Sequence, residues 1–266
     1  MSSQNVIADL NSLRNMVPVT HNITNFVVMN STANALLAVG AAPIMAHAPE
    51  ELDEIVAISH ALVVNIGTLR KPWIDSMYQA MHAAREKGIP VVLDPVGAGA
   101  SKLRTDTAMG LLQETGPSII RGNASEIRAM CYADAATRGV DSSHGADEAL
   151  DAAQELSAKY NCVVSISGET DLIVDKDQVT EISNGDAMMP KVTGLGCTAS
   201  SLTGAFAAAS DSQVQGAASA MAVMGIAGEM AAEKAEGPGS FQMYFLDALH
   251  QIDEEAVKSR LKMEEA

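Results

Sequence analysis

Residues 192–206 read VTGLGCTASSLTGAF, a glycine-rich turn that leads into a run of small uncharged side chains. Gly194 and Gly196 flank Leu195, and Cys197 follows directly. This pattern is typical of a tight turn that opens a helix, where free backbone N–H groups bind anions. We therefore predict that Gly194, Leu195, Gly196 and Cys197 form an anion hole with a thiol at its mouth.

A turn that only precedes a packed helix is the alternative interpretation, because a GxG pattern by itself is weak evidence. Three hydroxyl-bearing residues crowd the same helix start, namely Thr193, Thr198 and Ser200. Hydroxyls, a thiol and free N–H groups would thus surround one point, and this concentration favours the anion site.

Around this stretch, apolar runs of strand length alternate with helical patterns. Four runs predict buried strands: residues 61–66, 90–93, 118–120 and 161–166. Helical patterns cover residues 71–87, which Gly88 ends, and about 146–160, and the chain from Cys197 onward is mostly helical. This alternation predicts an α/β fold whose mostly parallel sheet has helices on both faces.

The edge of the sheet and the number of domains follow from the same pattern. Residues 172–174 and 179–182 flank DKDQ and predict a hairpin at the sheet edge. No repeat, low-complexity segment or Pro/Gly linker divides the 266 residues. We therefore expect a single domain over residues 1–266.

Charge and cysteine content exclude several classes of protein. The chain has 17 basic and 33 acidic residues, a net charge of −16, and no basic run, which argues against nucleic-acid binding. Its three cysteines are far apart and lack CxxC spacing, so neither a disulfide framework nor a structural zinc site is indicated. No apolar run is long enough to span a membrane and no signal peptide is evident, so we expect a cytoplasmic protein.

Polar residues follow the predicted strands, and ligands of parallel sheets bind at the carboxyl ends of strands. Asp94 ends one strand and opens the loop of LDPVGAGA. An Asx turn is the alternative, because Asp before Pro is common in turns. The position of Asp94 favours a carboxylate directed at a ligand or metal.

The next strand leads into RGNASE, which also has two interpretations. Asn123 could cap a helix with Glu126 as its capping-box partner, a purely structural role. Alternatively, Arg121 contacts a phosphate and Glu126 lies near Mg²⁺. Magnesium takes few protein carboxylates and fills its other positions with water and phosphate oxygens, so Asp94 and Glu126 suit it.

Two further segments suggest a lined pocket. The loop of SISGETD, residues 165–171, is either an ordinary loop or a nucleotide contact at the same sheet edge. Asn22, Thr24 and Asn25 can each cap the helix that runs to Val39, and three candidates exceed what one cap needs. Met45 is typical core, or a soft apolar wall beside a ring. His21 and His47 lie too far apart in sequence to suggest a metal pair.

Together these stretches resemble the hydroxyethylthiazole kinase family of the ribokinase-like superfamily. The matching segments are HNITNFVVMNSTANALLAVGAAPIMAHAPEE, VVNIGTL, LDPVGAGA, RGNASEI, VTGLGCTAS and EGPGSFQMYFLDAL, which span residues 18 to 249. The resemblance implies a three-layer αβα sandwich and an enzyme that phosphorylates the hydroxyl of 4-methyl-5-(2-hydroxyethyl)thiazole with Mg-ATP. The product, a thiazole phosphate, would enter thiamine diphosphate biosynthesis by salvage.

The same resemblance implies roles for individual residues. Met45, Gly194 and Asn25 would bind the thiazole, and Arg121 and Ser167 would bind ATP. Asp94 and Glu126 would be the Mg²⁺-side carboxylates. The family often has Thr in place of Ser167 and GTGC in place of GLGC. The family also implies a homotrimer with active sites between subunits.

Cys197 takes the place where many ribokinase-like relatives have the Asp of GxGD, their general base. We expect the helix N-terminus to lower the pKa of this thiol. Phosphoryl transfer needs mainly alignment and charge stabilisation, so Cys197 could act as a weak base or only as a positioned thiol. Direct in-line transfer is simpler than a covalent phosphocysteine.

Two other functions are alternatives to this interpretation of the sequence. Another ribokinase-like activity, such as a pyrimidine-alcohol kinase or an ATP-dependent repair dehydratase, is disfavoured by GLGC and HNITN. A non-catalytic thiazole- or nucleotide-binding regulator is disfavoured because Asp94, Glu126, Arg121 and Cys197 are all present.

Overall fold

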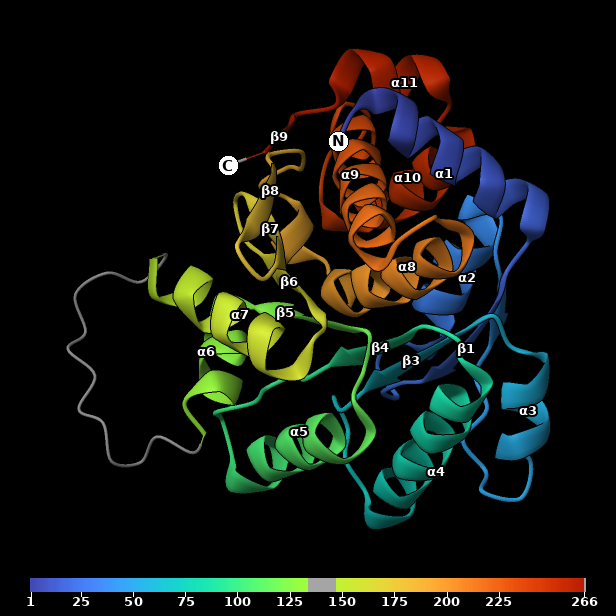
Figure 1. The fold of residues 1–266 in the computed structure, drawn as a ribbon. Coiled ribbons are helices and arrows are strands. Elements are labelled where there is room, and N and C mark those ends of the chain that lie inside the picture. The colour runs from blue at the N-terminus through green and yellow to red at the C-terminus, as the bar shows by residue number, and fades with distance from the viewer. Residues whose placement is uncertain (134–146, 266) are drawn as a thin grey trace.

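Within residues 1–133 and 147–265, which the computed structural model describes, a nine-stranded sheet runs through the middle of the molecule (Figure 1). Its strands are, in spatial order, β2 (Ala42–Ile44), β1 (Val19–Ile23), β3 (Ala61–Asn65), β4 (Val91–Asp94), β5 (Ile119–Asn123), β6 (Val163–Ser167), β7 (Asp171–Asp175), β8 (Gln178–Ile182) and β9 (Met263–Glu265). Strands β2 through β6 pair in parallel and β7 to β9 in antiparallel fashion. The predicted mostly parallel sheet is confirmed.

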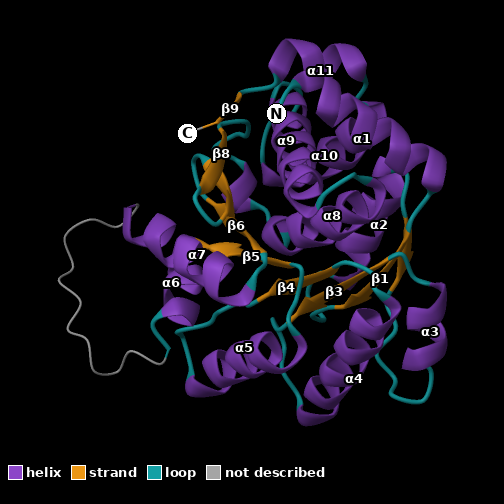
Figure 2. Ribbon diagram, viewed as in Figure 1, coloured by secondary structure: helices purple, strands orange, loops and turns teal. Residues whose placement is uncertain are grey.

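Helices cover both faces of this sheet, which gives three layers (Figure 2). One face is covered by α3 (Leu52–Ile58), α4 (Lys71–Lys87), α5 (Lys102–Thr115), α6 (Ala124–Cys131) and α7 (Asp147–Tyr160). The other is covered by α1 (Ser3–Met16), α2 (Met29–Val39), α8 (Leu195–Ala209), α9 (Gln213–Ala232), α10 (Pro238–Gln251) and α11 (Glu254–Arg260). A short 3₁₀ helix, Met189–Lys191, precedes α8.

Strand side chains alternate between the two helical layers, because successive residues of a strand point to opposite faces. In β3, Leu62 and Val64 join the apolar cluster under α3 to α7, whereas Val63 joins the cluster under α8. Burial on both faces explains why the parallel strands read as continuous apolar runs rather than as alternating patterns.

The central elements agree with the sequence predictions. Helix α4 spans residues 71–87 as predicted, and Gly88 ends it with a left-handed φ of 76°. Helix α7 is described from Asp147 to Tyr160, while Ala146 lies outside the described residues. Strand β5 extends beyond the predicted residue 120 to Asn123, so Arg121 belongs to the strand itself.

Strands β1 and β2 do not appear among the sequence predictions. Strand β1 reads VTHNI, and its polar residues Thr20, His21 and Asn22 are buried. A buried strand with polar side chains presents no apolar run, and such side chains are retained in the core largely through hydrogen bonds. Nε2 of His21, for example, lies 2.9 Å from the Ala46 carbonyl oxygen.

Two local predictions are wrong. The β7–β8 hairpin is not at the sheet edge, because β9 from the chain end pairs with β8. None of the predicted residues caps α2, which begins after Val28 without a side-chain cap. Asn22 lies in β1 instead, where its Oδ1 accepts a hydrogen bond of 2.7 Å from Ser201 Oγ of α8.

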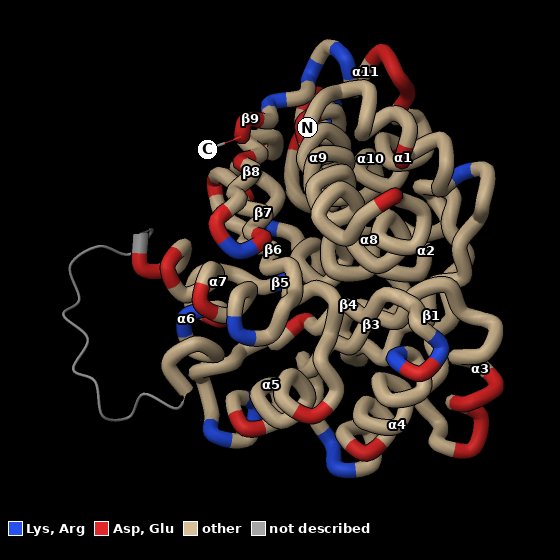
Figure 3. The backbone as a smooth tube through the Cα atoms, in the orientation of Figure 1, with Lys and Arg blue, Asp and Glu red and all other residues tan. Residues whose placement is uncertain are grey.

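Charged side chains are rare on α8, which begins at the glycine-rich turn, and on α9, which follows it (Figure 3). Helix α8 has none, and Glu229 is the single charged residue of α9. Across the described ranges 1–133 and 147–265, none of the helices combines the length and the hydropathy that a membrane span requires.

Candidate active site

The glycine-rich turn forms the N-terminus of α8, as predicted. Gly194 is the N-cap residue and has a left-handed φ of 87°. A Cβ at Gly194 would lie 2.6 Å from Val28 Cγ1, so both its backbone conformation and its close packing against the start of α2 require glycine. No side chain caps α8. The N–H groups of Leu195, Gly196 and Cys197 therefore have no partner within the helix and can bind a ligand.

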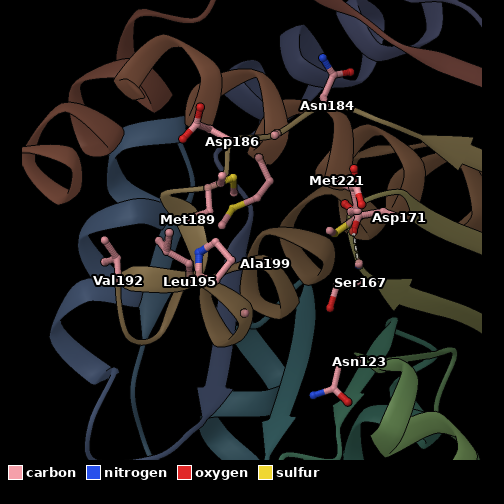
Figure 4. A pocket seen from close by; sticks show the side chains of 18 of the residues that line it. Asn123, Ser167, Asp171, Asn184, Asp186, Met189, Val192, Leu195, Ala199 and Met221 are labelled. Carbon is pink, nitrogen blue, oxygen red and sulfur yellow. Dashed lines mark hydrogen bonds between the residues drawn. The ribbon is translucent and has the colours of Figure 1, made fainter. Parts of the chain in front are cut away.

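A cavity of about 900 Å³ lies beside this helix start. Its polar lining includes Arg121, Asn123, Ser167 and Asp171, and its apolar lining includes Met189, Leu195, Met221 and Met224. In Figure 4, Asn123 and Ser167 lie on one side of the cavity, whereas Met189, Val192 and Leu195 lie across from them. The residues lining the cavity come from β5, β6, the loop into β7, the segment 183–194 before α8, α8 and α9, so distant parts of the chain build it.

Arg121 connects the sheet to the first turn of α8. Its side chain is buried, and Nη1 donates a 3.0 Å hydrogen bond to the Gly196 carbonyl oxygen. Its Nε is buried without a partner among the described residues. A buried guanidinium with an unused donor at a cavity wall suits a phosphate. Ser167, the last residue of β6, lies opposite Asn123 in the parallel register of β5 and β6.

Asp171 gives the polar lining a buried carboxyl group. Its Oδ1 accepts a 3.0 Å hydrogen bond from the Gly168 N–H. Burial raises the pKa of Asp171 to about 6, although that hydrogen bond and the charge of Arg121 act in the opposite direction. Sequence reasoning placed Asp171 only within a polar loop and assigned it no role.

The side chain of Asn184, which also lines the cavity, is fully engaged in hydrogen bonds within the protein. Asn184 Nδ2 donates to Glu229 Oε1 at 3.1 Å and to the Arg260 carbonyl at 2.7 Å, and its Oδ1 accepts from Lys262 N–H at 2.8 Å. With Asn184 engaged in this way, the methionines that line the cavity provide apolar, polarizable surface suited to a flat ring.

Asp94 lies at the carboxyl end of β4 and is almost fully buried. Its Oδ2 accepts hydrogen bonds from Asn65 Nδ2 at 2.6 Å and from Ser200 Oγ at 2.7 Å. Burial, assisted by the charge of Glu126, raises the pKa of Asp94 to about 7, while Arg121 and the two hydrogen bonds oppose the shift. Asp94 thus contacts α8 through Ser200 and lies close enough to Arg121 to be affected by its charge, whereas its predicted metal role stays a prediction.

Glu126 forms the capping box that one interpretation predicted. Its Oε2 accepts from the Asn123 N–H at 2.9 Å, and Asn123 Oδ1 accepts from the Glu126 N–H at 3.0 Å. In addition, Glu126 Oε1 accepts from the Gly97 N–H at 2.8 Å, which ties the loop after β4 to α6. A metal role for Glu126 stays a prediction. Residues 1–133 and 147–265 contain no group of three or more His, Cys, Asp or Glu able to hold a metal.

Cys197 lies in the first turn of α8 and is half-buried. The prediction of a lowered pKa is wrong for the free chain: burial raises the pKa of this thiol to about 11. The nearby Asp94 carboxylate adds to the rise, and hydrogen bonds from Asn65 and Asn25 oppose it. Desolvation of the sulfur therefore outweighs the favourable end of the helix.

Asn25 meets Cys197 from the loop after β1. Its Nδ2 lies 3.4 Å from Cys197 Sγ and 2.8 Å from Asn65 Oδ1. Sequence reasoning missed Asn65, although this residue ends the strand before Asp94 in the sheet and could have been found by that position. A direct contact of Asn25 with the substrate stays a prediction, because its amide N–H groups are directed at Asn65 and Cys197.

Met45 follows β2 and is partly buried against the apolar cluster on the α8 face. Its contact with a thiazole stays a prediction. Nearby, the Trp73 ring packs against Phe26 and His47, with ring centroids 4.6 and 4.3 Å apart. This aromatic group borders the loop that carries Asn25.

Comparison with known proteins identifies full-length relatives. A sequence model of the hydroxyethylthiazole kinase family matches residues 10–255. The hydroxyethylthiazole kinase of Nitratidesulfovibrio vulgaris (strain Miyazaki F) is 54% identical over 261 residues, which is 98% of each chain. That of Aliivibrio salmonicida is 51% identical over 263 residues, covering 99% of this chain and 98% of the relative.

Solved structures agree with the sequence relatives. The hydroxyethylthiazole kinase of Pyrococcus horikoshii superposes with a TM-score of 0.93 at 40% identity over 99% of both chains. Pyridoxal kinase from Staphylococcus aureus, solved with AMP-PCP and pyridoxal, gives a TM-score of 0.67 at 13% identity over 94% of this chain and 99% of its own. A ribokinase-like superfamily protein from Enterococcus faecalis gives 0.64 at 11% identity over 96% of each chain. The last two likenesses show the fold alone.

Proposed function

The chain belongs to the hydroxyethylthiazole kinase family. We propose that it phosphorylates hydroxyethylthiazole for thiamine biosynthesis, at a site formed by the cavity and by the side chains around Cys197. The reaction transfers the γ-phosphoryl group of ATP to the alcohol of 4-methyl-5-(2-hydroxyethyl)thiazole. One observation carries the proposal at the level of the site. Gly194, Leu195 and Gly196 at the start of α8 line the 900 Å³ cavity. Cys197, the next residue, contacts Asn25, and Ser200 one turn later contacts Asp94.

The cavity is the proposed ATP site. The methionines of its lining suit the base, and Arg121, Ser167 and Asn123 line the part of the cavity proposed for the phosphates. The free N–H groups of Leu195, Gly196 and Cys197 would then bind the transferring phosphoryl group. Backbone donors fixed by a helix stabilise developing charge without having to reorganise during the reaction.

The residues present fit a magnesium ion. The charge of Glu126 helps to raise the pKa of the nearby Asp94 carboxyl, so a cation beside the two carboxylates would relieve this repulsion. Two carboxylates, with the remaining positions filled by water and phosphate oxygens, are the usual protein contribution to Mg²⁺. When bound, the ion would neutralise charge on the β- and γ-phosphates.

The alcohol would lie on the Cys197 side of the anion hole, with Gly194 and Met45 beside the thiazole. The alcohol oxygen attacks phosphorus while the bond to the β-phosphate oxygen breaks, and no covalent enzyme intermediate forms. The alcohol proton leaves late in such a transfer, so little prior ionisation of the nucleophile is needed. The proposed acceptor of that proton is the thiolate form of Cys197, which is a minor species at neutral pH because burial raises the pKa of the thiol to about 11.

A homotrimer with active sites between subunits is part of the same proposal. It is supported by the family and by two large apolar side chains that follow Asn25, Phe26 at 55% and Val27 at 64% exposure. A neighbouring subunit that covered them would close the substrate side of the site.

A coupled assay of ADP release tests the proposed function. Folded protein with the thiazole alcohol, ATP and Mg²⁺ should release ADP and form the thiazole phosphate, whereas EDTA should abolish turnover. Pyridoxal in place of the thiazole alcohol is the matched substrate control. Absence of ADP release above background from folded protein would refute the proposal.

A further inference from the structure

Asn65 shares its amide among three partners at the carboxyl end of β3. Its Nδ2 donates to Asp94 Oδ2 at 2.6 Å, and its Oδ1 accepts from Asn25 Nδ2 at 2.8 Å and from the Gly67 N–H at 2.9 Å. Only about 1% of the residue is exposed. A buried amide with this many partners holds a single orientation, because each alternative would leave a buried group unpaired.

Two backbone N–H groups fix the direction of the whole network. The Gly67 N–H can only donate, so the atom of Asn65 that faces it is the oxygen. The Val27 N–H likewise donates to Asn25 Oδ1 at 3.1 Å, so the NH₂ group of Asn25 faces Asn65 and Cys197. Both amide orientations therefore follow from backbone donors rather than from a choice between nitrogen and oxygen.

It follows that the Cys197 sulfur accepts a hydrogen bond. Asn25 Nδ2 has two protons, of which one goes to Asn65 Oδ1 and the other to Cys197 Sγ at 3.4 Å. Because the Asn25 N–H points at the sulfur, the S–H proton of the Cys197 thiol is directed away from Asn25. A proton that the thiolate takes from the substrate would also lie on that far side. Asn65 holds the Asn25 amide in this orientation, in addition to its own effect on the pKa of the Cys197 thiol.

The close approach of Gly67 adds a steric constraint on the same amide. A Cβ at Gly67 would lie 2.5 Å from Asn25 Nδ2 and 2.8 Å from its Cγ. Any side chain at this position would push the Asn25 amide off the Cys197 sulfur without removing a hydrogen-bonding group. The backbone at Gly67 thus packs against the functional end of Asn25.

We propose that Asn65 is a positioning residue for phosphoryl transfer, which acts by holding the Asn25 amide on the Cys197 sulfur. Gly67 serves the same purpose by leaving room for that amide. The inference rests on the proposed function, because its effect is measured on the turnover of the thiazole alcohol. Neither Asn65 nor Gly67 needs to contact a substrate for this role.

Two substitutions test the proposal through different physical changes. Asn65→Ala should lower kcat by about 10- to 100-fold, and Gly67→Ala by about 10-fold. The KM values for ATP and for the thiazole alcohol should stay within about threefold of wild type, because the change acts on the reacting group rather than on binding. A loss confined to KM in both variants would overturn the proposal.

Matched controls separate positioning from general destabilisation. Gly110→Ala would collide with the Tyr78 hydroxyl between α4 and α5, and Ser157→Ala would remove the partner of the Lys176 N–H at 2.8 Å. Both controls should lower the Tm but keep kcat near wild type. Equal losses of kcat in the controls and in the two test variants would mean that the network has no special role.

A coupling measurement and a structure complete the test. In a Cys197→Ala background, Gly67→Ala should cost less than about a further twofold in kcat, because the group it acts through is gone. A full additional loss in that background would contradict the proposal. A crystal structure of Gly67→Ala should show Asn25 displaced from Cys197, and an unmoved Asn25 would contradict it too. This structural result is independent of activity, so it still decides the network if wild type fails to turn over.

Discussion

Arg121 Nη1 and the Gly196 carbonyl oxygen are joined by a 3.0 Å hydrogen bond that links β5 to the first turn of α8. The same guanidinium lines the cavity and has an unpartnered Nε. One side chain thus both fixes the helix start and borders the cavity proposed for the nucleotide. This double duty depends on the planar fork of arginine, which a lysine ammonium does not reproduce.

For Arg121→Lys we therefore expect a KM for ATP raised by about 10-fold or more and a lower kcat, with the KM for the thiazole alcohol little changed. Steady-state kinetics with each substrate varied in turn measure the split. Arg85→Lys on α4 is a matched control, because Arg85 only donates a long 3.5 Å bond to Thr115 O. An unchanged KM for ATP in Arg121→Lys would remove Arg121 from the nucleotide site.

Cys197→Asp should remain active and can exceed wild type, because a carboxylate replaces a thiol whose pKa burial raises to about 11. Cys197→Ser should lose about 10²–10⁴-fold in kcat, because a hydroxyl is not a base at neutral pH. Near-normal turnover of the Ser variant would show that the thiol only occupies space and does not act as a base. Intact-mass analysis after ATP addition checks for a phosphocysteine, and a stoichiometric adduct on wild type would exclude direct in-line transfer.

Asp94→Asn should lower kcat strongly and raise the Mg²⁺ concentration needed for half-maximal activity. The neutral amide still accepts from Asn65 or Ser200, so the fold should persist while the charge is lost. Titration of Mg²⁺ at saturating ATP measures the shift. Normal turnover at limiting Mg²⁺ would contradict a metal role for Asp94.

Glu126→Gln is expected to act in two ways, because both Glu126 carboxylate oxygens accept backbone N–H groups. One of these bonds must be lost, so a drop in Tm should accompany the loss of kcat. If the variant loses stability but keeps its Mg²⁺ requirement and kcat, Glu126 has the capping role alone.

Asp171→Asn should stabilise the free chain at high pH. Burial raises the pKa of Asp171 from 3.8 to about 6, so the folded chain holds this proton more tightly than the unfolded chain does. The stability from this proton is fully present below about pH 4 and is lost as the pH rises through about 6. Asparagine keeps the acceptor for the Gly168 N–H and removes the charge.

Denaturant unfolding at three pH values, without nucleotide, measures this effect. The gain in free energy of unfolding should be about 1–3 kcal/mol at pH 8 and close to zero at pH 4. Asp177→Asn, at an exposed turn, serves as the control and should show no such pH dependence. If the free energy of unfolding of Asp171→Asn at pH 8 equalled that of wild type, burial of the charged carboxylate would not destabilise the fold.

The assembly state gives a prediction that needs no substitution. Light scattering at micromolar concentration should give three times 27.7 kDa, about 83 kDa. Val27→Asp should weaken the assembly, because Val27 is 64% exposed and apolar in the isolated chain. A monomer mass for wild type would contradict the trimer.

Much of the fold follows from local patterns in the sequence. The apolar runs at β3, β4 and β6 and the periodic pattern of α4 are visible because burial on both sheet faces selects continuous apolar strands. Strand β1 lacks such a run because its buried side chains are polar, and two of them, His21 and Asn22, have partners in the loop after β2 and in α8. Such partners are distant in sequence, so a local pattern cannot indicate them.

The candidate site likewise has features that local sequence indicates and features that depend on tertiary contacts. The sequence by itself determined the glycine turn, the capping box of Asn123 and Glu126, and the carboxylate at the end of β4, since each depends on neighbours within a few residues. Only the tertiary structure decided that Asn65 joins Asp94 to Asn25, and that Cys197 has a raised rather than a lowered pKa. Hydrogen-bond partners and desolvation depend on what the folded chain packs around a group, and those neighbours come from strands and helices far apart in the sequence.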